Sequence, residues 1–144
     1  MKTKTLFLTD LLLLICIIPT SVTGFILHWA AHQADHTLWH NWAVAHVLST
    51  LLFTIIVAVH IYGHWGWYKS LVKNGAKNKS RITILLTILI LSVIVTGYTV
   101  LIRHQGANSH FGLWHYVLGI ALTIVAIGHL IKRHKVLSKG LKSK

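Results

Sequence analysis

The chain alternates long apolar stretches with short polar connections. Four stretches are long and apolar enough to cross a bilayer: residues 6–29, 42–63, 82–102 and 113–131. A helix rises about 1.5 Å per residue, so about 20 apolar residues cross a hydrocarbon core of about 30 Å. The pattern therefore predicts an all-α membrane protein, in which residues 1–144 form a single up-down-up-down bundle of four transmembrane helices.

The composition supports a membrane protein. Hydrophobic residues make up 54% of the chain and charged residues 11%, which is too apolar for a soluble domain. The single cysteine, Cys16, excludes a disulfide framework and a c-type haem attachment motif. A signal peptide ending before Gly24 is an alternative for the first stretch, but the apolar run continues through Leu27 and favours a retained helix.

Positive charge is concentrated on one side of the predicted bundle. Of the 14 Lys and Arg residues, two lie near the N-terminus, five within residues 69–81 and six in the C-terminal tail, which leaves Arg103 alone on the other side. The positive-inside rule then predicts cytoplasmic termini. This topology accounts for the basic loops, so we expect no nucleic-acid partner. Residues 69–81 are predicted to form a polar loop that turns at Asn74 and Gly75.

Histidines recur inside two of the apolar stretches. His46 and His60 are 14 residues apart, and so are His115 and His129. Fourteen residues span roughly 21 Å of helix, and at two heptads both imidazoles of a helix lie on the inward seam of a left-handed bundle. The spacing predicts two inward histidine pairs at two depths.

An internal sequence repeat indicates which histidines form pairs. The segment Val22–Thr23–Gly24 precedes His28 in the first stretch, and Val95–Thr96–Gly97 precedes His104 in the third. Two helical hairpins therefore look like divergent copies. In that arrangement the second and fourth stretches are parallel, which pairs His46 with His115 near the outer face and His60 with His129 near the inner face.

Haem ligation is the function that these pairs favour. Low-spin haem iron takes two axial ligands from opposite sides of the porphyrin, and neutral imidazoles serve both places. Small residues suited to backbone approaching the ring are Gly24, Gly97, Thr50 and Gly119, while Phe53 and Leu122 would fill the space between two rings. The alternative is that the histidines are hydrogen-bonding links between helices. Arg103 is a candidate partner for a haem propionate, with ordinary interfacial anchoring as its alternative.

With these features the chain resembles the di-haem membrane cytochromes b, including the cytochrome b561-like and other small bacterial four-helix cytochromes. The 14-residue spacing, the glycines and the segment HIYGHW at residues 60–65 carry the resemblance. It implies two bis-histidine b haems, held by His46 with His115 and by His60 with His129. It also implies a location in the inner membrane of a bacterium. Electrons would pass between the membrane faces and be exchanged with quinone or a redox partner protein.

Other interpretations of the histidines remain open. His64 lies one turn after His60 and could replace it as a ligand. An outer row, His28, His32, His36 and His40, would line one face of a continuing helix and suit zinc or copper, which makes a divalent-metal binding or transport protein the alternative function. Solvated interface histidines, a proton path or a quinol pocket would also explain that row, which His104 and His110 join. A quinone-coupled oxidoreductase is a third possibility. The sequence does not predict the oligomeric state.

Overall fold

The computed structural model describes residues 3–33, 35–76, 80–103, 106 and 108–142, and its side chains between residues 5 and 131 within those ranges. This part of the chain forms helices and their connections. The helices are α1 (Thr3–Ala30), α2 (His36–Gly63), α3 (Trp65–Asn74), α4 (Arg81–Ile102) and α5 (His110–Lys142).

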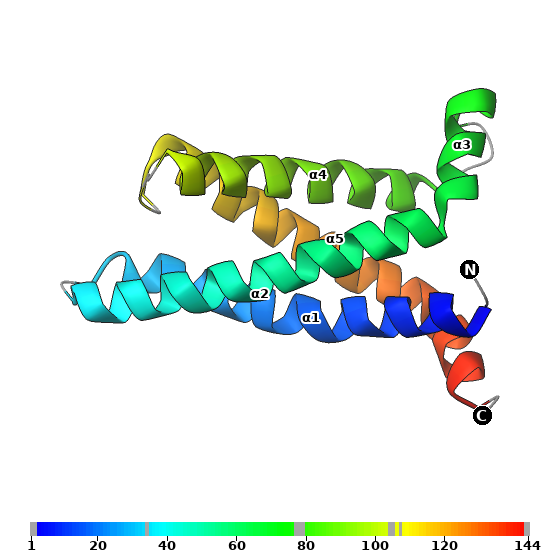
Figure 1. Ribbon diagram of the computed structural model, residues 1–144, viewed down its shortest axis with the longest axis horizontal. Helices are drawn as coiled ribbons and strands as arrows, with labels where there is room; N and C mark the ends of the chain where they lie inside the picture. Colours follow the sequence, from blue (N-terminus) through cyan, green and yellow to red (C-terminus); the bar gives the residue numbers. More distant parts are fainter. Residues whose placement is uncertain (1–2, 34, 77–79, 104–105, 107, 143–144) are drawn as a thin grey trace.

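The four long helices pack as a bundle, which confirms the predicted fold class (Figure 1). Helix α1 packs against α2 and α5, and α5 also packs against α4, so α2 and α5 lie on opposite sides of the bundle. The connections α1–α2 and α4–α5 lie at one end, which we call the loop end. Both termini and α3 lie at the other end, which we call the terminal end (Figure 1).

The surface of the bundle is apolar. All four long helices are long and apolar enough to cross a membrane, and large hydrophobic side chains such as Ile15, Ile55 and Val95 are more than half exposed. In water such a surface would be costly, whereas lipid tails solvate it. The chain is therefore a multi-pass membrane protein. A small core of Cys16, Phe53 and Val57 joins α1 to α2 at the middle of the bundle.

Helix α2 begins earlier than the apolar pattern predicts. Its first residue is His36, because the Asp35 carboxylate caps the helix and accepts the Leu38 backbone N–H at 2.9 Å. Helix α1 ends at Ala30, so the connection is only residues 31–35. The alternative in which a continuing helix carries the outer histidine row does not hold, because His28 lies on α1, His32 in the connection, and His36 and His40 on α2.

Helix α3 replaces part of the predicted polar loop. Residues 69–74 are helical, and the prediction of a loop there is wrong, although the chain does turn at Gly75, whose φ of +67° suits glycine. Helix α3 projects from the bundle at the terminal end (Figure 1). The Tyr68 hydroxyl lies 3.3 Å from the Thr87 hydroxyl and ties α3 to α4.

Candidate functional site

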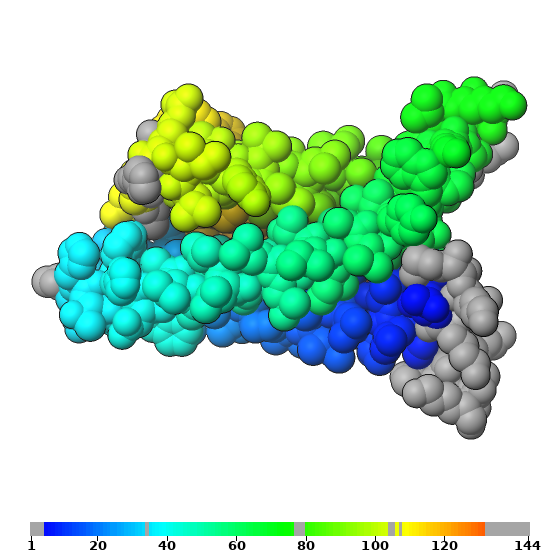
Figure 2. All heavy atoms as spheres, in the orientation of Figure 1, coloured from blue at the N-terminus to red at the C-terminus, as the bar shows by residue number. Residues whose placement is uncertain are grey.

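A cavity of about 700 Å³ lies in the loop-end half of the bundle. Its walls come from α1, α2, α4 and α5, and they are almost wholly apolar. The volume is within the range of about 300–1,000 Å³ typical of sites for small molecules and cofactors. Figure 2 shows α2 and α4 as separate ridges near this end, with part of α5 visible between them.

Two histidines meet in this cavity. His46 on α2 and His115 on α5 both line it, and their ring centroids are 6.0 Å apart with an interplanar angle of 73°. Sequence spacing predicts this meeting, and the structure brings the two side chains together. Because α2 and α5 lie on opposite sides of the bundle, the rings approach each other across its interior.

The first hairpin holds the His46 ring against α1. His46 Nδ1 lies 3.1 Å from the Thr23 hydroxyl oxygen, and the backbone of Thr20 is a further hydrogen-bond partner of the ring. The Thr23 hydroxyl donates its own proton to the Pro19 carbonyl at 2.7 Å. Gly24 makes room for the ring, since a Cβ atom there would lie 3.1 Å from His46 Cε1.

The second hairpin repeats this arrangement. Each residue of α1 that contributes to it corresponds to the residue 73 positions later in the sequence, which lies on α4. His115 Nδ1 lies 3.2 Å from the Thr96 hydroxyl oxygen and 3.1 Å from the Val93 backbone carbonyl oxygen. The Thr96 hydroxyl donates to the Ser92 carbonyl at 2.8 Å. A Cβ at Gly97 would lie only 2.8 Å from His115 Cε1, so this position requires glycine.

These contacts set the tautomer of both histidines. A carbonyl oxygen can only accept a hydrogen bond, and each threonine proton is already donated to another carbonyl. Nδ1 must therefore carry the proton in His46 and in His115. The lone pair is then on Nε2, which is the state of a histidine prepared to bind a metal through Nε2.

The spacing of the two rings suits a shared metal ion. A metal–imidazole bond is about 2 Å long, and an imidazole nitrogen lies about 1 Å from its ring centre, so two histidines on one ion have centroids roughly 6 Å apart. The observed 6.0 Å matches this value. The donor set, the tautomers and the apolar cavity together fit a haem held by two histidines.

The small and bulky residues predicted around a haem all line this cavity. Thr50, Phe53, Gly119 and Leu122 all line the cavity, and Phe53 and Leu122 are buried. Gly119 has open space where a Cβ would be, as a residue facing a porphyrin needs. Gly24 and Gly97 line the cavity as well, and each also makes room for the imidazole of its histidine.

The outer histidines do not form one cluster. His28 stacks on Tyr116 with centroids 3.7 Å apart and an interplanar angle of 12°, and His32 packs edge-on against His28. His36 contacts Trp39 within α2, and His110 contacts Trp114 within α5. His104 lies outside the described residues.

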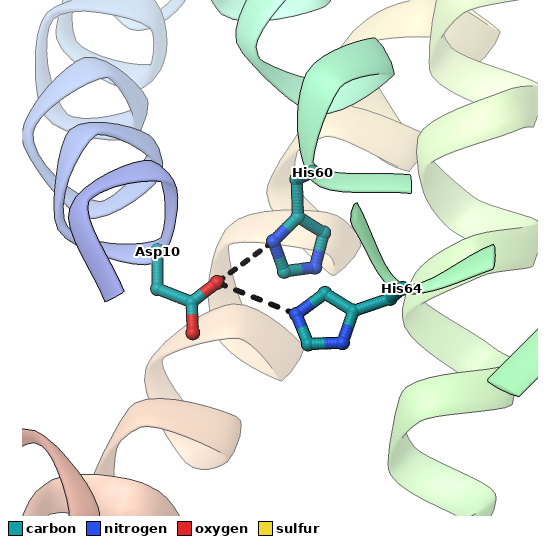
Figure 3. Close-up of side chains that lie close together, drawn as sticks. All are labelled: Asp10, His60 and His64. Atoms are coloured by element: carbon teal, nitrogen blue, oxygen red, sulfur yellow. Dashed lines mark ion pairs between the residues drawn. The ribbon is translucent and has the colours of Figure 1, made fainter. Parts of the chain in front are cut away.

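At the terminal end, a carboxylate meets two histidines (Figure 3). His60 Nδ1 lies 2.8 Å from Asp10 Oδ1, and His64 Nε2 lies 3.7 Å from the same oxygen. These three side chains are about one third exposed in the bare protein. His129 is partly buried on α5, and its pairing with His60 stays a prediction.

Arg103 follows the end of α4 near the loop end. Its guanidinium lies 5.5 Å from the centre of the Phe111 ring, within the range of a cation–π contact. The side chain is exposed. Its predicted role toward a haem propionate stays a prediction.

Sequence reasoning missed the residues that orient the histidines. Thr23 and Thr96 were visible only as part of the repeated Val–Thr–Gly segment, and that repeat was the signal for their shared role. Asp10 could have been found by register. In an antiparallel hairpin, 13 residues back along α1 from Thr23 and 14 residues forward along α2 from His46 reach the same depth, which places Asp10 beside His60.

Comparison with protein-family models, with curated proteins and with solved structures finds no match to this chain.

Proposed function

We propose that this chain is a di-haem b cytochrome that carries electrons across the inner membrane of a bacterium, coupled to quinone or to a redox partner protein. The observation that carries the proposal is the pair of facing histidines, His46 and His115, each held by the same threonine, carbonyl and glycine arrangement in its own hairpin. Histidines that merely link helices by hydrogen bonds need neither a matched tautomer nor a cavity between them.

Each part of the site has a defined task in this proposal. His46 and His115 hold the outer haem through Nε2, and the threonine and carbonyl acceptors keep both rings in orientation. His60 and His129 hold the inner haem. Bound haem supplies reversible one-electron transfer. The protein supplies ligation, the apolar walls that exclude water, and a fixed separation between the two depths.

The proposed orientation follows from charge. Basic residues concentrate at the termini and in the connection between α2 and α4, so the terminal end is placed in the cytoplasm and the loop end outside. The outer haem is then the one between His46 and His115. The metal-transport alternative is weakened by geometry, because its histidine row is divided between α1, the connection after it, and α2.

Haem content and single-histidine variants test the proposal. Full-length protein purified from haem-replete cells should show a sharp reduced α band and two haems per chain in a pyridine haemochrome assay. His115→Leu should leave one haem, because its iron loses an axial ligand and the remaining pair is on the other side of the membrane. His64→Leu should keep both.

A matched control comes from the same helix as His46. His36 lies in the first turn of α2, away from the facing pair, so His36→Leu should keep two haems. A colourless wild-type preparation, or two haems surviving in His115→Leu, would reject the proposed function.

A further inference from the structure

Helix α3 runs across the axis of the bundle and not along it. Figure 1 shows the four long helices extending between the two ends of the molecule, while α3 leaves the terminal end at a steep angle to them. The long helices are the segments that can cross a membrane, so the bundle axis follows the membrane normal. A helix that leaves the bundle across this axis at one end lies along the membrane surface.

Tyr68 shows which side of α3 faces the bilayer. Its hydroxyl oxygen lies 3.3 Å from that of Thr87, and Thr87 lies six residues after Arg81, where α4 begins. At about 1.5 Å per residue, the contact is roughly 9 Å along α4 toward the loop end. Tyr68 therefore extends from α3 toward the hydrocarbon layer, and the side of α3 that carries it faces the membrane.

Two apolar side chains share this side with Tyr68. Trp65 precedes it by three residues and Val72 follows it by four, which are the spacings that place side chains on one helix face. The ring centroids of Trp65 and Tyr68 are 6.5 Å apart. In the bare protein Trp65 is 52% exposed and Val72 is 88% exposed. Lipid would cover this membrane-facing side of α3.

Two lysines border the same side. Together with Trp65, Tyr68 and Val72, Lys69 and Lys73 line a shallow surface pocket of about 340 Å³. Lysine side chains lay their methylene groups along apolar surface and extend the ammonium group to the polar boundary. Helix α3 contains no acidic residue that could pair with either lysine. The pocket therefore combines an apolar wall with two adjacent positive charges.

We propose that this side of α3 is a binding site for an anionic phospholipid. An acyl chain packs against Trp65 and Val72, and the phosphate group lies between Lys69 and Lys73. A lipid with net negative charge fits better than a zwitterionic one, because a choline headgroup brings its own positive charge to the two ammonium groups. This inference goes beyond electron transfer and does not depend on bound haem.

Native mass spectrometry of the full-length protein in detergent tests the site, with phosphatidylglycerol or phosphatidylcholine as the titrated lipid. The wild type should bind phosphatidylglycerol more tightly. Lys69→Gln and Lys73→Gln should each weaken phosphatidylglycerol binding about fivefold, since a lysine at an anionic membrane surface contributes about that factor, and leave phosphatidylcholine binding unchanged. Val72→Asn should weaken the binding of both lipids by a similar factor, because both present acyl chains. Arg81→Gln is the matched control, since it removes one exposed positive charge at the terminal end but outside the pocket, and should leave both affinities unchanged.

Three results would overturn the inference. The first is equal affinity of the wild type for the two lipids. The second is a loss in Arg81→Gln as large as in the lysine variants, which would mean that the positive charge of the terminal end acts as a whole. The third is displacement of the bound lipid by an equal concentration of inorganic phosphate, which would indicate a site for a free anion. A colourless preparation that still prefers phosphatidylglycerol would reject the cytochrome and leave the lipid site intact.

Discussion

The two hairpins use one device at the loop end and differ at the terminal end. Helices α1 and α4 each offer a backbone group, a threonine hydroxyl and a glycine to a histidine on the following helix, and the two distances from hydroxyl oxygen to Nδ1 are 3.1 and 3.2 Å. Thirteen residues away, α1 carries Asp10 and α4 carries Thr83. The residues that the two hairpins share determine how each imidazole is held, whereas the residues that differ determine the charge at the terminal end.

The largest expected effect comes from filling the glycine positions. Gly97→Ala would place a Cβ at 2.8 Å from His115 Cε1, where neither the helix backbone nor the ring can move freely. Overpacking of this kind costs about 1–3 kcal/mol. We expect Gly97→Ala to displace His115 and to leave one haem per chain, measured by pyridine haemochrome assay and by thermal unfolding.

Gly24→Ala tests the corresponding glycine of the first hairpin. The corresponding distance to His46 Cε1 is 3.1 Å, so the ring needs a smaller shift and haem loss should be partial. Gly66→Ala is the control for stability and fold, because Gly66 lies on α3 outside the cavity and open space surrounds its Cβ position. Equal and full haem retention in Gly24→Ala and Gly97→Ala would show that the histidines do not depend on these glycines.

A smaller effect is expected from the threonines. Thr23→Val and Thr96→Val each remove one acceptor from a histidine Nδ1 while a backbone carbonyl remains. Loss of a group that orients a metal ligand typically costs about 10-fold to 100-fold in affinity, and the remaining carbonyl favours the lower end. Haem transfer to an acceptor such as apomyoglobin should measure a similar loss in both variants. A large loss in only one would break the equivalence of the two hairpins.

The smallest effect concerns the contact between the hairpins. The Ser21 hydroxyl on α1 lies 3.0 Å from the Thr123 hydroxyl on α5. Hydrogen bonds between membrane helices contribute about 0.6 kcal/mol on average. Ser21→Ala should lower the thermal midpoint slightly and keep the full haem content. A loss of haem in this variant would mean that the bundle depends on this contact far more than its geometry indicates.

Apolar length and charge were enough to predict the bundle. The four spans followed from residue count and hydropathy, and the meeting of His46 with His115 followed from equal spacing in two parallel helices. The local starts and ends of helices were harder to predict from the sequence. The start of α2 depends on the Asp35 cap, and α3 forms in a segment whose lysines and asparagines resemble a loop.

The orientation of each histidine could not be predicted from spacing alone. Spacing places an imidazole on a face of a helix, but the tautomer depends on which acceptor lies beside Nδ1 on the neighbouring helix. Gly24 shows the same limit. The needs of a porphyrin predict its small size, and the structure adds that it also makes room for the ring of His46.

The cavity at the loop end takes one histidine from each hairpin, so neither half of the chain contains it alone. A molecule that binds there can only recognise the assembled bundle. At a free concentration 1,000 times its dissociation constant it would stabilise that assembly by about 4.1 kcal/mol. If the proposed haem is that molecule, its supply would act as a checkpoint in biogenesis, because newly inserted chains that capture it would resist membrane proteases better than chains that do not.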